Sequence, residues 1–256
     1  MRRTNPLILD EIFTLVDLRY RFLRKGLNMK LLLTLFFIIA ALDVSAISNI
    51  DKGKQAFKAQ DYENAAKYFH ISADTGDNDA QRYLGYLYSV GKGVEKDYAI
   101  AAVWYTKSAQ QGDAISQYNL GSMYERGRGL SRDYQQALLW YDKSAKQGNP
   151  RAQFHLAQLH YQGLGTLKDL AEALYWFNEA AKDNNAGVQY QIGHMHEQGE
   201  GTAKDMIKAV SWYTKSAKQG EPKAQLKLAE LYANGLGVEK DQQKSEYWLR
   251  QAQESR

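Results

Sequence analysis

The amino-acid sequence predicts an all-α fold: an α-solenoid, or superhelix, in which antiparallel helix pairs stack with a 36-residue period. Two observations support this prediction. The five tryptophans of the 256-residue chain follow one another at intervals of 36 residues: Trp104, Trp140, Trp176, Trp212 and Trp248. Apolar residues make up 44% of the chain and prolines number only 3, a composition that suits packed helices. A fixed period of this length is typical of one supersecondary unit copied end to end.

Each repeat is expected to begin with a first helix, here called helix A. In the first complete repeat, Leu84 and Leu87 recur at helical spacing and predict one apolar face. Gly85 lies beside them, and its missing side chain lets a neighbouring helix approach closely. Helix A is expected to end at the Gly91–Gly93 segment, because glycine readily adopts the positive φ with which a chain leaves a helix.

A second helix, here called helix B, follows in each repeat. Asp97 is suited to N-cap it, because a carboxylate accepts hydrogen bonds from the free N–H groups of the first turn. Trp104 is expected to pack between helices rather than to form a stacking platform for a ligand. Gly112 is expected to end helix B, and Asn184, which also tolerates the left-handed region, takes the corresponding position in the third repeat.

The recurring pattern resembles the Sel1-like repeat, a relative of the tetratricopeptide repeat. It is AQxxLGxxYxxGxGVxxDxxxAxxWYxKxAxxG. The resemblance covers five consecutive units, residues 78–113, 114–149, 150–185, 186–221 and 222–256, and it implies a superhelix whose concave face is lined by helix A. Residues 50–77 lack the four-residue Gly-x-Gly insertion, and we expect them to form a TPR-like N-terminal capping unit.

Residues 29–46 have the order of a signal peptide. Met29–Lys30 supplies positive charge, Leu31–Leu42 is an uninterrupted apolar run, and Val44–Ala46 matches a cleavage pattern of small residues. The run is too short to cross roughly 30 Å of hydrocarbon as a helix. We therefore expect export with cleavage of the signal, and an uncleaved membrane anchor is the alternative. Residues 1–28 are interpreted as a gene-model extension or a disordered tail.

Composition and motif context exclude several classes of function. The chain has no cysteine, which excludes disulfides and thiolate catalysis. Most of the net charge of +4 lies in residues 1–46, so the rest is nearly neutral and a poor candidate for nucleic-acid binding. The Gly-x-Gly segments join two helices, not a strand and a helix, and do not predict a phosphate site. His194 and His196 do not share a helix face, so no metal site is expected. We expect no cofactor and no enzymatic activity.

The positions of helix A that the repeat pattern leaves variable form the candidate partner-binding surface. They recur at i, i+3 and i+7, with aromatic residues first, amides and imidazoles in the middle, and charges last. Such a surface can hydrogen-bond to a peptide or a sugar and use tyrosines as anchors. The candidate residues are Tyr83, Tyr86, Asn119, Ser122, Arg126, His155, Gln158, Gln191, His194, Lys227 and Glu230.

The resemblance implies a non-catalytic scaffold or adaptor that binds protein partners on the concave helix-A face. Bacterial relatives act as envelope regulators, as scaffolds for polysaccharide export and as factors in host-cell interaction. Together with the predicted signal peptide, this indicates an exported protein of the bacterial cell envelope, in the periplasm or secreted, with no stable membrane anchor after cleavage. The alternatives are a binder of glycans or peptidoglycan fragments that modulates a cell-wall enzyme, and a secreted factor for host-cell interaction.

Overall fold

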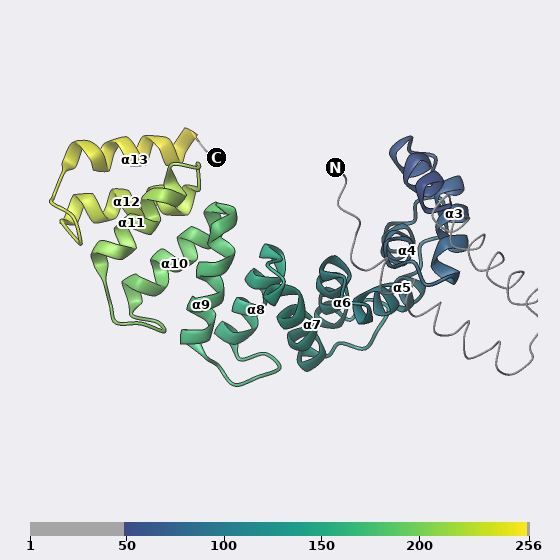
Figure 1. Cartoon of the computed structure of the whole chain (residues 1–256). Coiled ribbons are helices and arrows are strands. Elements are labelled where there is room, and N and C mark those ends of the chain that lie inside the picture. Colours follow the sequence, from purple (N-terminus) through teal and green to yellow (C-terminus); the bar gives the residue numbers. More distant parts are fainter. Residues whose placement is uncertain (1–48, 255–256) are drawn as a thin grey trace, which may run out of the picture.

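The computed structural model describes residues 49–254, all of whose regular elements are helices (Figure 1). The predicted signal peptide and the segment before it lie outside the described residues. Residues 49–58 form a first helix. The later elements are α3 (Tyr62–Asp74), α4 (Asn78–Val90), α5 (Tyr98–Gln110), α6 (Ala114–Arg126), α7 (Tyr134–Lys146), α8 (Pro150–Gln162), α9 (Leu170–Ala180), η1 (Ala181–Asp183), α10 (Ala186–Gln198), α11 (Met206–Ala217), α12 (Pro222–Asn234) and α13 (Gln242–Glu254).

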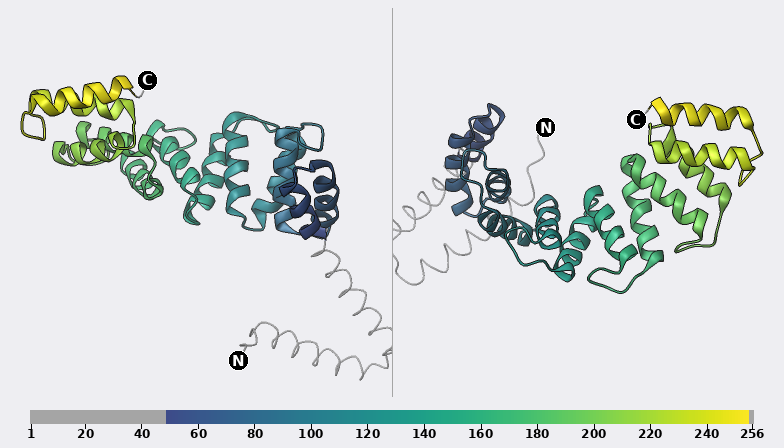
Figure 2. Two further views of the ribbon diagram at one scale, coloured as in Figure 1. Left: turned by 90° about the horizontal axis from the view of Figure 1, so that it is seen from above. Right: turned by 180° about the vertical axis from the view of Figure 1, so that it is seen from behind.

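The helices stack as pairs into an open arc, which confirms the predicted all-α solenoid (Figures 1 and 2). Helix A and helix B of one repeat pack closely, as in α4 with α5 and α6 with α7, and each helix B packs on the next helix A. In Figure 1, α4 and α6 lie toward the inside of the arc and α5 and α7 toward its outside. None of the described helices is long and apolar enough to cross a membrane.

The helix ends follow the predicted capping residues. The Asp97 carboxylate accepts hydrogen bonds from the backbone N–H groups of Ala99 and Ile100, at 2.7 and 3.0 Å. Gly91 ends α4 in the left-handed region with φ of 73°. Asn184 takes the same conformation, with φ of 56°, where other repeats have glycine. The expectation of capping at these positions is therefore confirmed.

In three of the five Gly-x-Gly repeats, helix A and helix B meet at a glycine, whereas Ala157 and Ala229 take this position in the other two. A Cβ atom on Gly85 would lie 2.7 Å from the ring of Tyr105, too close for any side chain. Gly121 faces Tyr141 and Gly193 faces Tyr213 in the same way. The glycine thus provides the space into which a helix B tyrosine packs, as expected from the sequence.

The second glycine of each Gly-x-Gly segment forms a contact between repeats. Gly129 has φ of 71°, and a Cβ atom there would overlap the carbonyl group of Tyr98, the first residue of the preceding helix B. Backbone therefore meets backbone at this point. The other pairs are Gly93 with Tyr62, Gly165 with Tyr134, Gly201 with Leu170 and Gly237 with Met206.

Buried glutamines join consecutive repeats by hydrogen bonds. Gln117 donates through Nε2 to the carbonyl of Ala109, at 3.1 Å, near the end of the preceding helix B. Its own Oε1 accepts from Gln147 Nε2 at 2.7 Å. Gln147 also donates to the carbonyl of Gly112, so one side chain ties two repeats together. These bonds satisfy carbonyl groups that a helix end leaves free.

The tryptophans belong mostly to the core. Trp104, Trp140 and Trp176 are buried, whereas Trp212 and Trp248 toward the C-terminus are half-buried. Three of the tryptophans have a lysine one helical turn later that lies over the indole ring, as Lys107 does with its Nζ atom 4.2 Å from the centre of the Trp104 ring. The predicted packing role of Trp104 is confirmed.

Replacing Gly129 with alanine should destabilise the chain strongly, because the new Cβ atom meets a backbone carbonyl that cannot move independently of α5. The left-handed backbone alone costs roughly 1–2 kcal/mol for a residue with a side chain, and overpacking adds about 1–3 kcal/mol. Gly148→Ala is the matched control: φ is 86°, but no atom lies within 4 Å of the added Cβ. Urea unfolding followed by circular dichroism compares the two; equal losses of stability would contradict the contact between repeats.

Candidate functional site: a groove along the inner helices

Three adjoining hollows run along the helix A surface and together form what we call the inner groove. The N-terminal hollow has a volume of about 200 Å³, the central hollow about 690 Å³ and the C-terminal hollow about 530 Å³. The first two share Tyr86 and Asn119 in their walls. The central and C-terminal hollows share Tyr118, Pro150 and Arg151. The inner groove is therefore a row of adjoining hollows that crosses several repeats.

The structure places the predicted residues in two groups. Those that line the groove are Tyr83, Tyr86, Asn119, His155, Gln158 and Gln191. Those that lie on helix A but outside the three hollows are Ser122, Arg126, His194, Lys227 and Glu230. All of them are half-buried or exposed. The stripe thus follows the surface of helix A, and the candidate residues that enter the hollows all come from its first two positions.

The two predicted tyrosine anchors have different surroundings. Tyr83 stacks on Phe69, with ring centres 4.6 Å apart and an angle of 5° between the rings. Its ring also lies 5.0 Å from that of Phe57, so Tyr83 helps to hold the first helix pair onto the array. Tyr86 is 37% exposed and forms part of both the N-terminal and central hollows. Tyr86 is therefore the tyrosine that a ligand can contact without disturbing the core.

Near the middle of the array, a carboxylate connects helix B with the next helix A. Tyr141 donates its hydroxyl hydrogen to Glu125 Oε2 at 2.6 Å. The Nδ1 atom of His155 lies 3.2 Å from the same oxygen, and the His155 ring stacks on Tyr141. Burial by itself raises the pKa of Glu125, but His155 and the Tyr141 hydroxyl outweigh it and hold that pKa below its usual value. Glu125 is therefore a charged, satisfied acceptor at neutral pH.

The same arrangement recurs two repeats later. Tyr213 donates to Glu197 Oε2 at 2.6 Å, and Lys227 Nζ lies 3.1 Å from Glu197 and from Glu230. Burial raises the pKa of the Tyr213 hydroxyl, and the neighbouring Glu197 raises it further. Predicted partner-binding residues such as Lys227 and Glu230 are thus engaged in charge pairs within the array.

The sequence-based stripe missed the aromatic floor of the groove. Tyr118, Phe154 and Tyr190 each occupy the position just before a stripe residue, and all three line the C-terminal hollow. Phe154 packs against Phe177 of helix B with ring centres 6.0 Å apart. The signal was present in the sequence, since three consecutive repeats carry an aromatic residue at this one position.

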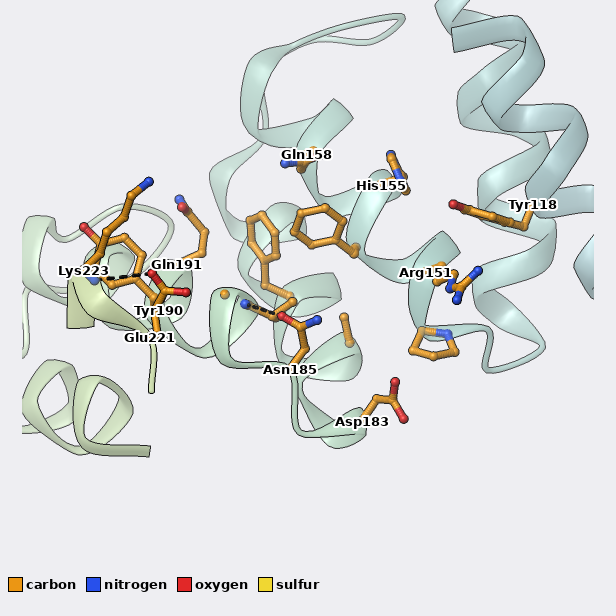
Figure 3. A pocket seen from close by; sticks show the side chains of 16 residues that line it. Tyr118, Arg151, His155, Gln158, Asp183, Asn185, Tyr190, Gln191, Glu221 and Lys223 are labelled. Atoms are coloured by element: carbon orange, nitrogen blue, oxygen red, sulfur yellow. Dashed lines mark hydrogen bonds between the residues drawn. The ribbon is translucent and has the colours of Figure 1, made fainter. Parts of the chain in front are cut away.

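Polar and charged side chains surround this aromatic floor (Figure 3). The labelled residues come from α6, α8, α10 and α12, from η1, and from the turns that precede α10 and α12. Figure 3 shows His155 and Gln158 along one edge, Asp183 and Asn185 along the opposite edge, Tyr118 and Arg151 toward one end, and Tyr190, Gln191, Glu221 and Lys223 toward the other. The hollow can therefore take an apolar group and hydrogen-bond to polar groups beside it.

The C-terminal hollow lies where the third repeat departs from the others. α9 ends after 11 residues and continues as a short 3-10 turn. Asp183 stands where the other repeats have a glutamine such as Gln147, so the glutamine link is absent from this junction. At the start of α10, Gly187 presents no side chain, and an added Cβ would meet only Asn185 Oδ1, at 3.4 Å. These departures leave open space between α8 and α10.

Nothing in the described part of the chain points to metal chemistry. Within residues 49–254 no group of three or more histidine, aspartate or glutamate side chains lies close enough to hold a metal ion. His196 is buried, and burial lowers its pKa, which keeps the imidazole neutral. His194 is half-buried, with Nδ1 3.7 Å from Glu200. The two histidines have separate environments, as their spacing on one helix requires.

Comparison with known protein families shows to which family the chain belongs. The Sel1 repeat model matches residues 51–77, 78–113, 114–149, 150–185, 186–221 and 222–254. The chain therefore belongs to the Sel1 repeat family, which confirms the resemblance seen in the sequence, and it carries six such repeats. The match includes the first helix pair, although that pair lacks the Gly-x-Gly insertion.

Two solved structures are similar in both sequence and fold. A Sel1 repeat protein from Oxalobacter formigenes is 37% identical, with a TM-score of 0.72 over 80% of this chain and 82% of that one. The protective antigen c5321 of uropathogenic Escherichia coli is 31% identical, with a TM-score of 0.78 over 90% of this chain. The match covers 49% of c5321, so this chain spans about half of that protein. None of the curated proteins matches the chain significantly.

Sel1 repeats generally serve as non-catalytic scaffolds for protein interaction, and the chain shares that architecture. Its inner groove combines aromatic rings, amides and a few charges across several repeats. Such a surface suits recognition of a protein segment, in which aromatic and arginine side chains provide most of the binding energy.

Replacing Tyr141 with phenylalanine should lower the free energy of unfolding by about 1–3 kcal/mol at pH 7, since Glu125 loses a hydrogen bond while staying charged and half-buried. Because the pKa of Glu125 is lowered in the folded chain, its stabilising effect is present above the usual pKa of 4.5 and is lost as the pH falls below it. The difference between the two chains should therefore shrink at acidic pH.

The control for this substitution is Tyr190→Phe, because the Tyr190 hydroxyl has no hydrogen-bond partner among the described residues. It should change stability by less than about 0.5 kcal/mol. Denaturant unfolding at pH 7 and pH 4 measures both variants. A loss that is the same for Tyr141 and Tyr190, or that does not depend on pH, would argue against the role given to Glu125.

Proposed function

We propose that the protein is a non-catalytic scaffold or adaptor of the bacterial cell envelope that binds a partner protein in the inner groove. The observation that carries the proposal is the continuity of the groove, since neighbouring hollows share walls from α4 to the start of α12. An extended protein segment fits a surface of this shape better than a compact small molecule does. Amides such as Asn119, Gln158 and Gln191 are placed to hydrogen-bond to its backbone.

Two features support the groove as the binding surface. Elsewhere on helix A, charges such as Lys227 are neutralised by neighbouring carboxylates within the array. Along the groove, by contrast, Tyr86 and Ile115 are exposed apolar side chains, 37% and 50% accessible. Exposed apolar side chains that line a concave surface are typical of interaction sites.

The envelope location is the second part of the proposal. It rests on the signal-peptide pattern of residues 29–46. The likeness to a protein described as a protective antigen of uropathogenic Escherichia coli agrees with an exported product. We propose the periplasm as the site of action, with signal cleavage after Ala46.

Disrupting the groove should abolish partner capture without unfolding the chain. The C-terminally tagged full-length protein, produced in its own host, is crosslinked and recovered from envelope fractions, and its partners are identified by mass spectrometry. The variant Tyr86→Ala/Gln158→Ala removes two groove side chains that are not part of the buried core. We expect it to lose the partner at unchanged helicity.

The matched control, Leu139→Ala/Tyr175→Ala, removes two exposed side chains of α7 and α9 outside the groove, 41% and 54% accessible. This control should retain the partner. Capture that survives the groove substitutions would refute the assigned surface. Recovery of cell-wall fragments in place of a protein, lost with the same groove variant, would favour the glycan-binding alternative.

Export predicts a mature protein that begins at Ile47. Replacing Ala46 with arginine should block cleavage, because signal peptidase requires a small residue at that position. The N-terminus of the tagged protein from periplasmic extract is determined by mass spectrometry, with Ala56→Arg as a control outside the cleavage pattern. Detection of intact residues 29–46 on the unmodified protein would contradict cleavage.

A further inference from the structure

The charge at the centre of the inner groove has no counter-ion. Arg151 lies in the wall that separates the central hollow from the C-terminal hollow and belongs to both. It is exposed, and its guanidinium forms no ion pair or hydrogen bond with any of the residues that the structure describes. A guanidinium presents several N–H donors in a fixed fork, so an unpaired one in a binding groove is a ready site for a carboxylate.

The other arginine of the groove shows the contrast. Arg82 lines the N-terminal hollow, and its guanidinium bonds to Asp79 and Asp113 at 2.7 and 2.6 Å. Its single positive charge is therefore matched by two carboxylates inside the array. Arg151 has no such neighbours, and it is the only charged residue in the lining of the central hollow. A carboxylate that enters from this side meets one cation and no competing anion.

On both sides of Arg151 the groove presents apolar side chains. The central hollow is lined by Tyr86, Val90 and Ile115, all exposed. The C-terminal hollow is floored by Phe154 and Phe177, whose rings pack together. Each hollow can take one bulky apolar side chain, and burial of such a side chain contributes about 1.5–3 kcal/mol.

Neither of the two carboxylates that line the C-terminal hollow forms an ion pair with Arg151. Glu221 caps α12, where its side chain accepts from the N–H of Lys223. Asp183 lies on the edge formed by the turn before α10 and pairs with neither Arg151 nor Lys223. Arg151 lies instead beside Tyr118, at the end that joins the central hollow (Figure 3).

We propose that the inner groove recognises an extended, acidic–apolar peptide segment of its partner. In this segment a carboxylate binds Arg151, and bulky apolar side chains on either side of it occupy the central and C-terminal hollows. The inference rests on the proposed function and adds the chemistry of the partner. The other repeats have Asp79, Ile115, Gly187 and Lys223 at the position of Arg151. Lys223 is the other cation in this set and lies at the opposite end of the C-terminal hollow beside Glu221 (Figure 3), so Arg151 is the cation that fixes a carboxylate near the centre of the groove.

The probe is a random peptide library displayed on phage and selected on the full-length chain. We expect the selected peptides to carry aspartate or glutamate between two bulky apolar residues. The consensus peptide is then synthesised and titrated by fluorescence polarisation against the chain and its variants. Arg151→Gln should weaken binding at least about tenfold, and Arg151→Glu should weaken it further.

Charge reversal makes the test specific. A second peptide with lysine in place of the central acidic residue should bind Arg151→Glu better than it binds the unchanged protein. Arg151→Glu should fold normally, because a glutamate in the first turn of α8 interacts favourably with the helix dipole. The matched control is Lys218→Glu, an exposed cation at the end of α11 outside the groove, which should leave the affinity for the acidic peptide unchanged.

The outcomes separate this inference from the proposed function. Selection of no peptide, selection without an acidic residue, or equal affinity for the acidic peptide in Arg151→Gln and the unchanged chain would overturn the acidic–apolar ligand. The scaffold function would still stand if the groove variant Tyr86→Ala/Gln158→Ala loses the captured partner. Loss of affinity with Lys218→Glu as large as with Arg151→Glu would show a general charge effect and would also overturn the inference.

Discussion

The array depends on one backbone contact, the approach of each Gly-x-Gly segment to the first turn of the preceding helix B. At Gly129 a side chain would overlap the Tyr98 carbonyl, and four other junctions repeat this contact. Because the contact is between backbones, it sets the spacing of repeats independently of the side chains elsewhere. The residues on the exposed side of helix A can then differ from repeat to repeat while the stacking of the helices stays the same.

Because these residues differ between repeats, the inner surface has two kinds of region. Where Glu125 and Glu197 accept tyrosine hydroxyls and contact His155 and Lys227 of the next repeat, the exposed side of helix A is used to link repeats. Where the third repeat shortens α9 and Gly187 opens the start of α10, aromatic side chains and an unpaired arginine remain available. The departure from the repeat pattern is therefore the place where this chain differs from a generic scaffold.

The period, the capping aspartates and the small residue at the helix pair could be predicted from the sequence, because each reflects a local requirement that recurs along the array, with Ala157 and Ala229 in place of the glycine in two repeats. The floor of the groove could not, since a period shows which residues share a column but not how far helix A rotates toward the groove. Tyr83 illustrates the limit: it occupies the variable stripe, yet it stacks on Phe69 of the first helix pair. The residue type varies freely in the column of Arg151, which also holds Asp79 and Lys223, so repetition gave no sign of its role.

The central claim is that a partner segment lies in the inner groove, and site-specific photo-crosslinking tests it most directly. The photoreactive residue p-benzoylphenylalanine is placed at Gln158, inside the C-terminal hollow, or at Leu139, exposed on α7 outside the groove. Irradiation of living cells should give a partner adduct from position 158 and none from position 139. An adduct formed only from position 139 would contradict the account and move the interaction to the outer helices.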